Sequence, residues 1–307
     1  MDNFVLVSFL LTEMMCFCLF VLPPWVTLFL TRIRKGIPLI KNWPSVHPRL
    51  DLIDVIVTFA AYLGSQILAT FLVLDWPSTG NDFSVNPLLM SPLNSSAGIG
   101  MLGGTTIAMT LVFCRRGDFR SMRIRFDNLP RQFTLGLVCA FCILPAIFML
   151  NLFVSFSLVE YSHPVIETFL SEMSLSTLIS TAFTVIIAAP LVEEFVFRGV
   201  LLTFLHRALQ RSWESDTIFW CSNRAQPVRP PADGWLSEHG AIIITSVLFA
   251  ALHVGQGAAY IPLFFLALAL GYVTNRTGSI WPAVTIHMTL NGISTMPLVM
   301  TYLQATG

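Results

Sequence analysis

The chain has 307 residues, of which 55% are hydrophobic and only 11% are charged. Because about 25% of the residues of an ordinary soluble domain are charged, this composition excludes a soluble globular protein and predicts one that is solvated by lipid. The formal net charge is zero, and the sequence has no concentrated basic segment of the kind that binds nucleic acid.

Apolar segments long enough to cross the hydrocarbon core of a bilayer recur along the chain. A helix rises about 1.5 Å per residue, so about 20 apolar residues span a hydrocarbon core of about 30 Å. The sequence therefore predicts an all-α, polytopic membrane bundle of about eight transmembrane helices. Their expected positions are residues 4–30, 52–74, 98–114, 133–158, 174–206, 240–255, 258–274 and 280–303.

The basic residues fall in alternate loops between these spans. The loops after the second and fourth spans contain no Lys or Arg, and Arg198 is the one basic residue inside a predicted span. The positive-inside rule places the basic loops in the cytoplasm, so we expect both termini on the opposite side. A wrong number of spans would have scrambled this alternation.

The chain divides into two predicted units, residues 1–170 with about four spans and residues 171–307 with the remainder. The spans of the first unit contain two acidic residues, Glu13 and Asp54, each close enough to a helix end to reach the membrane interface. We therefore expect the first unit to have a structural role.

The second unit carries charged and polar residues near the centres of its helices. A charged side chain at that depth costs about 2.5–3.5 kcal/mol on insertion scales, so its presence indicates function or pairing within the bundle. The charged and polar residues are Glu193, Glu194 and Arg198 in the fifth span, His253 in the sixth, and His287 and Asn291 in the eighth. Phe249 lies one helical turn before His253 in the sixth span.

Helical geometry separates the two glutamates. Glu194 and Arg198 are four residues apart in the favourable order, so they are expected to form an ion pair on one helix face. Glu193 is rotated by about 100° from Glu194 and has no partner on its own helix, which suits it to act as a general base.

The eighth span offers a second pair at the same spacing. His287 and Asn291 lie on one face and can present two donors to a developing oxyanion. Glu193, His253 and Asn291 each lie roughly 15–20 Å from the cytoplasmic end of their helices, which predicts that they share one layer.

Each element taken alone also has a structural interpretation. A Glu–Arg pair near a helix end can be a folding device, and a single intramembrane His is often only an interhelical hydrogen-bond partner. The occurrence of all three elements, in this order and at matching depth, favours a functional site over that interpretation. Phe249 is more often a packing residue than a catalytic one.

The three elements resemble the signature of the CAAX protease and bacteriocin-processing family, which includes the type II CAAX prenyl endopeptidases and the lysostaphin-resistance-protein-like proteins. The resemblance covers about residues 175–300. It implies that residues 171–307 form a catalytic core, in which Glu193 and His253 activate a water molecule. It further implies that His287 and Asn291 stabilise the tetrahedral oxyanion.

The same resemblance assigns supporting roles to the remaining residues. Arg198 would hold Glu194 and shape the site, and Phe249 would form one wall of it. The family is often described as metalloproteases, and Glu193, His253 and His287 offer a mixed carboxylate and imidazole set for zinc. No His-Glu-x-x-His motif is present, and Asn291 suits an oxyanion hole better than a zinc shell, so we favour a mechanism that requires no cofactor.

The activity implied is that of an intramembrane endopeptidase acting on a membrane-associated or prenylated peptide. Its expected partners are that substrate and the lipid bilayer, and a bacterial cell membrane is favoured over the endoplasmic reticulum. A non-catalytic membrane scaffold or bacteriocin-immunity protein of the same fold is the main alternative. A proton-coupled transporter is a third, which the few polar residues of the first four spans disfavour.

Overall fold

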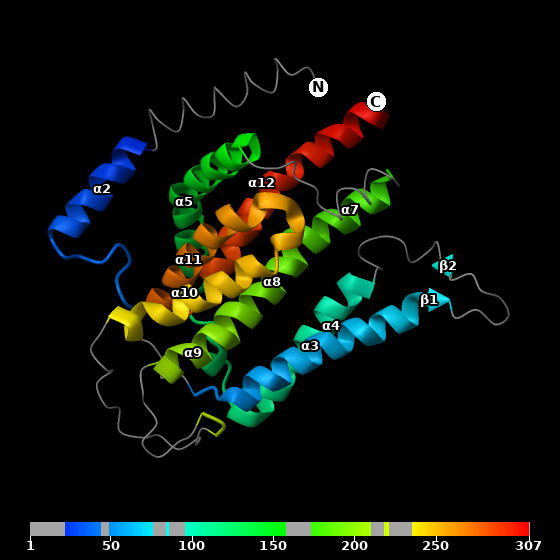
Figure 1. Ribbon diagram of the computed structural model, residues 1–307, viewed down its shortest axis with the longest axis horizontal. Coiled ribbons are helices and arrows are strands. Elements are labelled where there is room, and N and C mark those ends of the chain that lie inside the picture. The colour runs from blue at the N-terminus through cyan, green and yellow to red at the C-terminus, as the bar shows by residue number, and fades with distance from the viewer. Residues whose placement is uncertain are drawn as a thin grey trace.

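The computed structural model describes residues 22–43, 49–75, 84–85, 96–157, 173–209, 218–220 and 235–306. Over these residues the chain is all-α, apart from one antiparallel pairing between two strands of two residues each (Figure 1). The strands are β1 (Leu74–Asp75) and β2 (Ser84–Val85). The longer helices are α2 (Leu22–Arg34), α3 (Leu52–Val73), α4 (Ser96–Arg116), α5 (Leu129–Ser157), α10 (Trp235–Ala251), α11 (Tyr260–Thr277) and α12 (Trp281–Thr306).

One continuous helical run contains several labelled parts. It begins with α7 (Leu175–Phe183), where the Ser174 side chain accepts a hydrogen bond from the Thr177 N–H as an N-cap. It continues through the π-helical segment η4 (Thr184–Ala188), α8 (Ala189–Glu194), the π-helical segment η5 (Phe195–Leu201) and α9 (Leu202–Leu209). Two short 3₁₀ segments lie elsewhere, η3 (Phe119–Met122) and η6 (Val254–Ala259).

These helices match the predicted spans closely from the second span onward. The first expected span lies mostly outside the described residues, and α2 covers only its end. The expected end of the sixth span at residue 255 is wrong, because α10 ends at Ala251. The chain leaves helical geometry after it, with Gln256 at ψ 40° and Gly257 at φ 67°, a conformation that favours glycine.

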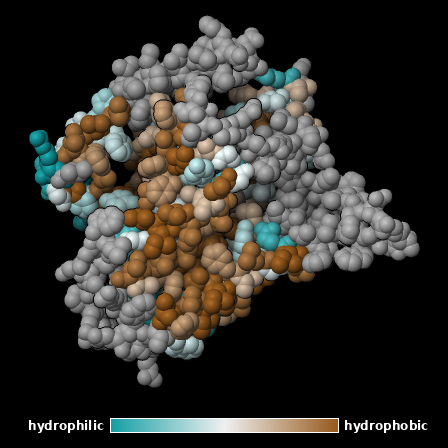
Figure 2. All heavy atoms as spheres, in the orientation of Figure 1, coloured by the Kyte–Doolittle hydropathy of each residue, from teal (hydrophilic) through white to brown (hydrophobic). Residues whose placement is uncertain are grey.

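The surface of the bundle is suited to lipid. Within the described residues, four helical runs are long and apolar enough to cross a membrane: Leu52–Ala69, Leu129–Val154, Leu175–Leu209 and Val254–Thr277. Large apolar side chains are exposed, among them Phe141 and Leu252 at 70% each. Figure 2 shows hydrophobic side chains gathered over the coloured part of one face, as expected of a surface that lipid covers. The fold is therefore an all-α membrane bundle.

Two packing units meet in the interior. Helices α3 and α4 form a close pair, because α4 has glycines where its backbone touches α3: a Cβ added at Gly104 would lie 2.8 Å from the Tyr62 Cα. Helices α5, α11 and α12 pack together, with Leu144, Leu270 and Ile286 in their shared core. Helix α5 precedes residue 170 and contacts α11 and α12, which follow it. The predicted division at residue 170 therefore does not coincide with a gap in the packing.

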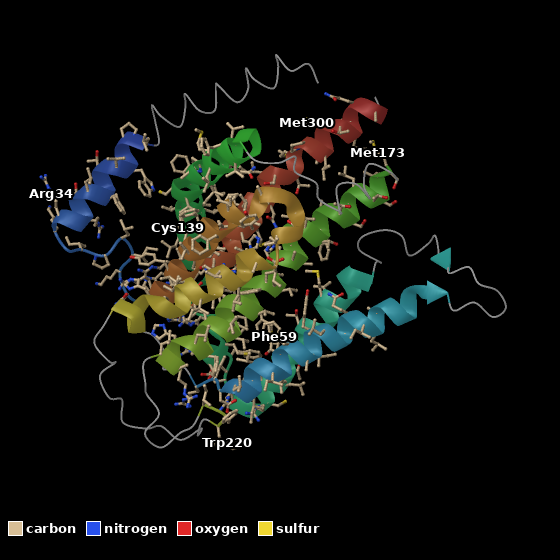
Figure 3. All side chains as sticks on the ribbon, viewed as in Figure 1. Arg34, Phe59, Cys139, Met173, Trp220 and Met300 are labelled. Carbon is tan, nitrogen blue, oxygen red and sulfur yellow. The ribbon has the colours of Figure 1, made fainter. Side chains whose placement is uncertain are left out.

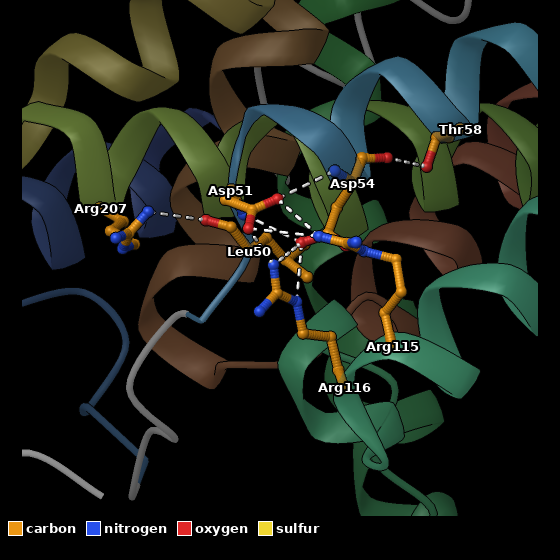
Figure 4. A network of polar contacts seen from close by, with 7 residues as sticks. All are labelled: Leu50, Asp51, Asp54, Thr58, Arg115, Arg116 and Arg207. Atoms are coloured by element: carbon orange, nitrogen blue, oxygen red, sulfur yellow. Dashed lines mark hydrogen bonds and ion pairs between the residues drawn. The ribbon is translucent and has the colours of Figure 1, made fainter. Parts of the chain in front are cut away.

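A buried cluster of ionic groups joins α3 to α4 at the end of the bundle that bears most of the basic residues (Figure 4). Asp51 and Asp54 accept hydrogen bonds from each other's backbone N–H groups, at 3.1 and 2.9 Å, which caps the start of α3. Arg115 contacts Asp54 at 2.8 Å, and Arg116 contacts Asp51 at 2.6 Å and also pairs with Asp54. We call these four residues the Asp–Arg cluster.

The burial of this cluster adds to what the sequence indicated. Asp54 lies in the first turn of α3, as expected, but both aspartates are 0% exposed. Asp54 is satisfied by two guanidinium groups from the next helix. The cluster is also tied to the second unit, because the Arg207 side chain of α9 donates to the Leu50 carbonyl at 3.3 Å, beside Asp51.

Candidate active site

The first motif lies in the short helix α8, between two π-helical segments. Glu193 and Glu194 are the last residues of α8, while Arg198 and Gly199 lie in η5. Single π turns inside α-helices are often found at functional sites, since they shift side chains out of the regular helical register. Gly199 meets a steric requirement there: a Cβ at this position would lie 2.9 Å from the Met122 carbonyl oxygen of η3.

Glu194 is the centre of a buried polar chain. Its Oε1 accepts a hydrogen bond from Arg198 Nη1 at 3.0 Å and another from His287 Nδ1 at 2.9 Å. The three side chains are 0%, 2% and 5% exposed, so they hold one another within the protein. Because an ionised carboxylate only accepts, His287 Nδ1 carries a hydrogen, and Nε2 is the ring nitrogen left for chemistry.

Glu193 lies at the accessible end of this chain. Its side chain is 25% exposed, and its Oε2 is 3.8 Å from His287 Nε2. That separation is too long for a hydrogen bond. Glu193 is thus the one carboxylate of the pair that a water molecule can approach.

The second motif joins this cluster through Phe249. The Phe249 ring is fully buried and lies 4.8 Å from the His253 ring, 6.0 Å from the His287 ring and 4.6 Å from the Arg198 guanidinium. The aromatic ring is therefore a shared wall between the three motifs. It also supports the positive charge of Arg198 through a cation–π contact.

His253 lies just beyond its helix instead of within it. It comes two residues after Ala251, the last residue of α10, at φ −104° and ψ 6°, and its Nδ1 is 2.8 Å from the Phe249 carbonyl oxygen. A carbonyl oxygen only accepts, so Nδ1 carries the hydrogen and Nε2 has a free lone pair. A histidine in this state is able to accept a proton.

Asn291 has a partner that the sequence did not indicate. Its Nδ2 donates to the Val185 carbonyl oxygen in η4 at 2.8 Å. That carbonyl is free for a local reason: the Ala189 N–H bonds to Thr184, and Pro190, the next possible donor, has no N–H. Asn291 thereby commits one of its two amide hydrogens and keeps the other, one turn along α12 from His287.

The arrangement around Val185 yields a prediction. In Pro190→Ala the new N–H is placed to bond the Val185 carbonyl, which would release Asn291 from its position. We expect kcat to fall about tenfold, less than the 10²–10³-fold that the loss of an oxyanion donor costs. Pro145→Ala, which removes a helix-interior proline from α5, is the matched control. A Pro190→Ala variant with the wild-type kcat would contradict this account of Asn291.

The structure thus brings Glu193, Glu194, Arg198, Phe249, His253 and His287 into one connected cluster, with Asn291 adjacent to it on α12. The described residues contain no group of three or more His, Cys, Asp or Glu side chains arranged to hold a metal ion. Of the three residues considered as zinc ligands, Glu193 and His287 approach each other. The Nδ1 atoms of His253 and His287 already form hydrogen bonds within the protein.

Sequence reasoning did not identify Val185 or Met122, which act through backbone carbonyls. The proline at position 190 was a visible signal for the first, because a proline always leaves one carbonyl of the preceding turn without its donor. No signal was available for the second, since any residue type offers the same carbonyl.

Comparison with known proteins supports the interpretation of these motifs. The family model for type II CAAX prenyl endopeptidase Rce1-like proteins matches residues 175–293. The match begins at the first residue of α7 and includes Glu193, His253, His287 and Asn291. Comparisons with curated proteins and with solved structures found no significant match.

Proposed function

We propose that this chain is an intramembrane endopeptidase that uses Glu193 as its general base, because residues 175–293 match the family model for type II CAAX prenyl endopeptidase Rce1-like proteins. One observation carries the proposal. The chain Arg198–Glu194–His287–Glu193 is buried in an apolar bundle and ends at a single carboxylate that is 25% exposed. Such a chain ends in an ionisable carboxylate that water can reach. The buried side chains at its other end hold their positions relative to one another.

In the proposed reaction, Glu193 takes a proton from water as the water oxygen bonds to the carbonyl carbon of the scissile peptide. Negative charge develops on the carbonyl oxygen, where the second Asn291 amide hydrogen and the His287 ring donate to it. The Glu194 carboxylate fixes the orientation of the His287 ring through Nδ1. The C–N bond then breaks, and the leaving nitrogen receives the proton held by Glu193.

His253 is assigned to the water on the basis of its free Nε2. Its Nδ1–H is fixed by the Phe249 carbonyl, so the ring orientation does not depend on the substrate. Glu193 and His253 together would share the proton of the attacking water. No covalent enzyme intermediate is required, because water itself is the nucleophile.

The proposed substrate is a peptide anchored at the membrane, of the prenylated CAAX type or another lipid-associated type. Two features support this class. The site lies in the interior of a lipid-facing bundle, and the polar end of Glu193 is the part open to a peptide. The bilayer would deliver such a substrate by lateral diffusion.

We test the proposal with purified wild-type protein in detergent and in liposomes, using internally quenched peptides with and without a prenyl group. Cleavage of either peptide supports the endopeptidase, and the preference between them defines the substrate class. The absence of cleavage from well-folded protein, with peptide binding retained, would move the assignment to a scaffold or immunity protein of the same fold.

The metal requirement is tested in the same assay. We propose that the reaction proceeds without a metal, so 1,10-phenanthroline at about millimolar concentration is expected to leave the rate within about twofold of the control. The non-chelating 1,7 isomer is the matched control. Loss of activity with the chelating isomer alone, restored by added zinc, would contradict the metal-free mechanism.

A further inference from the structure

The segment between α2 and α3 is fixed to the end of α11. The Trp43 N–H donates to the Arg276 carbonyl oxygen at 3.0 Å, and the Asn42 side chain accepts a hydrogen bond from Arg276 Nη1 at 2.9 Å. Ile40 packs against the hydrophobic cluster that α5, α11 and α12 share. Figure 3 shows the coil after Arg34 running from the end of α2 toward these helices. Two hydrogen bonds and an apolar contact therefore hold this segment in place.

Guanidinium groups from two helices bind the side chains of Asn42 and Trp43. Arg131, in the first turn of α5, lies over the Trp43 ring, with its Cζ 4.8 Å from the ring centroid. Arg276, in the last turn of α11, binds Asn42. Lys41 is exposed and directly precedes Asn42 in the sequence. Three cationic residues therefore lie on or next to one short segment. We call Lys41, Trp43, Arg131 and Arg276 the Trp–Arg cluster.

Two of the three cations in this cluster have no acidic partner. Lys41 and Arg131 form no ion pair within the part of the chain that the structure describes. The buried arginines differ in this respect, because Arg116 and Arg198 each pair with an acidic side chain. Like charges held near one another repel unless an anion lies between them. The Trp–Arg cluster is therefore suited to bind an anionic ligand.

The depth of the cluster corresponds to the lipid headgroups. Helix α5 begins at Leu129 and α11 ends at Thr277, and both belong to helical runs apolar enough to cross a membrane. Arg131 and Arg276 each lie within two residues of those helix ends. Tryptophan is enriched at the same level, because its ring has an apolar body and a polar N–H. An anion bound by these arginines would therefore lie where lipid phosphates lie.

An apolar stripe on α5 leads from the cluster into the membrane. Thr134, Val138 and Phe141 follow Arg131 at the i+3, i+7 and i+10 spacing of one helix face. Val138 is 55% exposed and Phe141 is 70% exposed. The helix rises about 15 Å between Arg131 and Phe141, which is half of a hydrocarbon core of about 30 Å. The stripe therefore matches the depth of one leaflet.

We propose that the Trp–Arg cluster and this stripe bind one anionic phospholipid of the adjacent leaflet. The lipid phosphate lies against the cations of the cluster, and one acyl chain follows Val138 and Phe141 along α5. Two observations favour a lipid over a soluble anion: the cations lie at headgroup depth, and the apolar stripe beside them is one leaflet deep. No residue of this site belongs to the candidate active site, so lipid binding is independent of peptide cleavage.

Native mass spectrometry of the full chain measures this binding. Wild-type protein mixed with equal amounts of phosphatidylglycerol and phosphatidylcholine is expected to retain the anionic lipid at least about fivefold more often. Arg131→Gln removes one charge and is expected to lower that retention about fivefold, whereas Arg131→Lys keeps the charge and should lower it by no more than about twofold. Arg120→Gln, a change at an exposed arginine in η3, is the matched control and should retain the lipid as the wild type does.

A photoreactive lipid locates the acyl chain. Phosphatidylglycerol with a diazirine in its acyl chain is expected to cross-link to residues 134–141 of the wild type, and about fivefold less to Arg131→Gln. Inorganic phosphate in excess should not reduce this cross-linking. Equal retention of the two lipids by the wild type, equal losses in Arg131→Gln and Arg120→Gln, cross-links confined to other helices, or displacement of the lipid by inorganic phosphate would each overturn the proposal.

Discussion

Replacing Glu193 by glutamine is expected to remove peptide cleavage while leaving the protein folded. Glutamine has nearly the same shape, but it accepts no proton from water, so the step that generates the nucleophile is lost. General-base catalysis contributes about 10²–10⁴-fold, and we expect the rate to fall by at least about 10³-fold. Because Glu193 is 25% exposed and its Oε2 comes no closer than 3.8 Å to His287 Nε2, the unfolding temperature of the variant should change little.

The adjacent residue supplies the matched comparison. Glu194→Gln removes the same charge one position along, but this carboxylate is 0% exposed and bonds both Arg198 and His287. Its loss leaves Arg198 without its buried counter-ion, so we expect both activity and stability to fall. Rates and thermal unfolding curves of the two variants, measured in one detergent, separate the roles. Wild-type cleavage by Glu193→Gln would disprove its assignment as the base.

Asp54→Asn is expected to cause the largest loss of stability in the N-terminal unit. The Asp–Arg cluster balances two carboxylates against two guanidinium groups, and both aspartates are fully buried. Neutralising one carboxylate leaves a surplus positive charge, chiefly on Arg116, whose side chain is 3% exposed. Breaking a buried pair in this way costs about 3–5 kcal/mol, which corresponds to a decrease in the unfolding temperature on the order of 10 °C.

The chain contains a suitable control for that change. Asp127 pairs with Arg125 at 2.7 Å, but the aspartate is 44% exposed. Exposed pairs contribute about 0–1 kcal/mol, so Asp127→Asn should leave the unfolding temperature almost unchanged. Equal effects of the two substitutions would show that burial of the Asp–Arg cluster does not govern its contribution to stability.

Much of the architecture was predictable because lipid imposes strong constraints on sequence. A spanning helix needs about 20 apolar residues, and the loops on the two sides differ in basic residues, so helix positions follow from hydropathy and charge. The pairing of Glu194 with Arg198 was predictable as well, since residues four apart on a helix always face the same way. The three motifs were visible because charged groups are rare at such depth.

Other features depended on the packing between helices. The burial of Asp54 was not predictable, because its partners Arg115 and Arg116 come from another helix about 60 residues later. The exit of His253 from α10 was also missed, because no proline and no side-chain cap marks the end of the helix there.

The sequence by itself determined that this protein is a helical membrane bundle with its polar chemistry on the spans after residue 171. Local rules suffice for that, because hydropathy and the i, i+4 spacing act within one helix. The tertiary structure alone decided which groups meet: Glu194 with His287, and Asn291 with the Val185 carbonyl. Those contacts depend on the rotation and the height of each helix relative to its neighbours, and side-chain packing sets both.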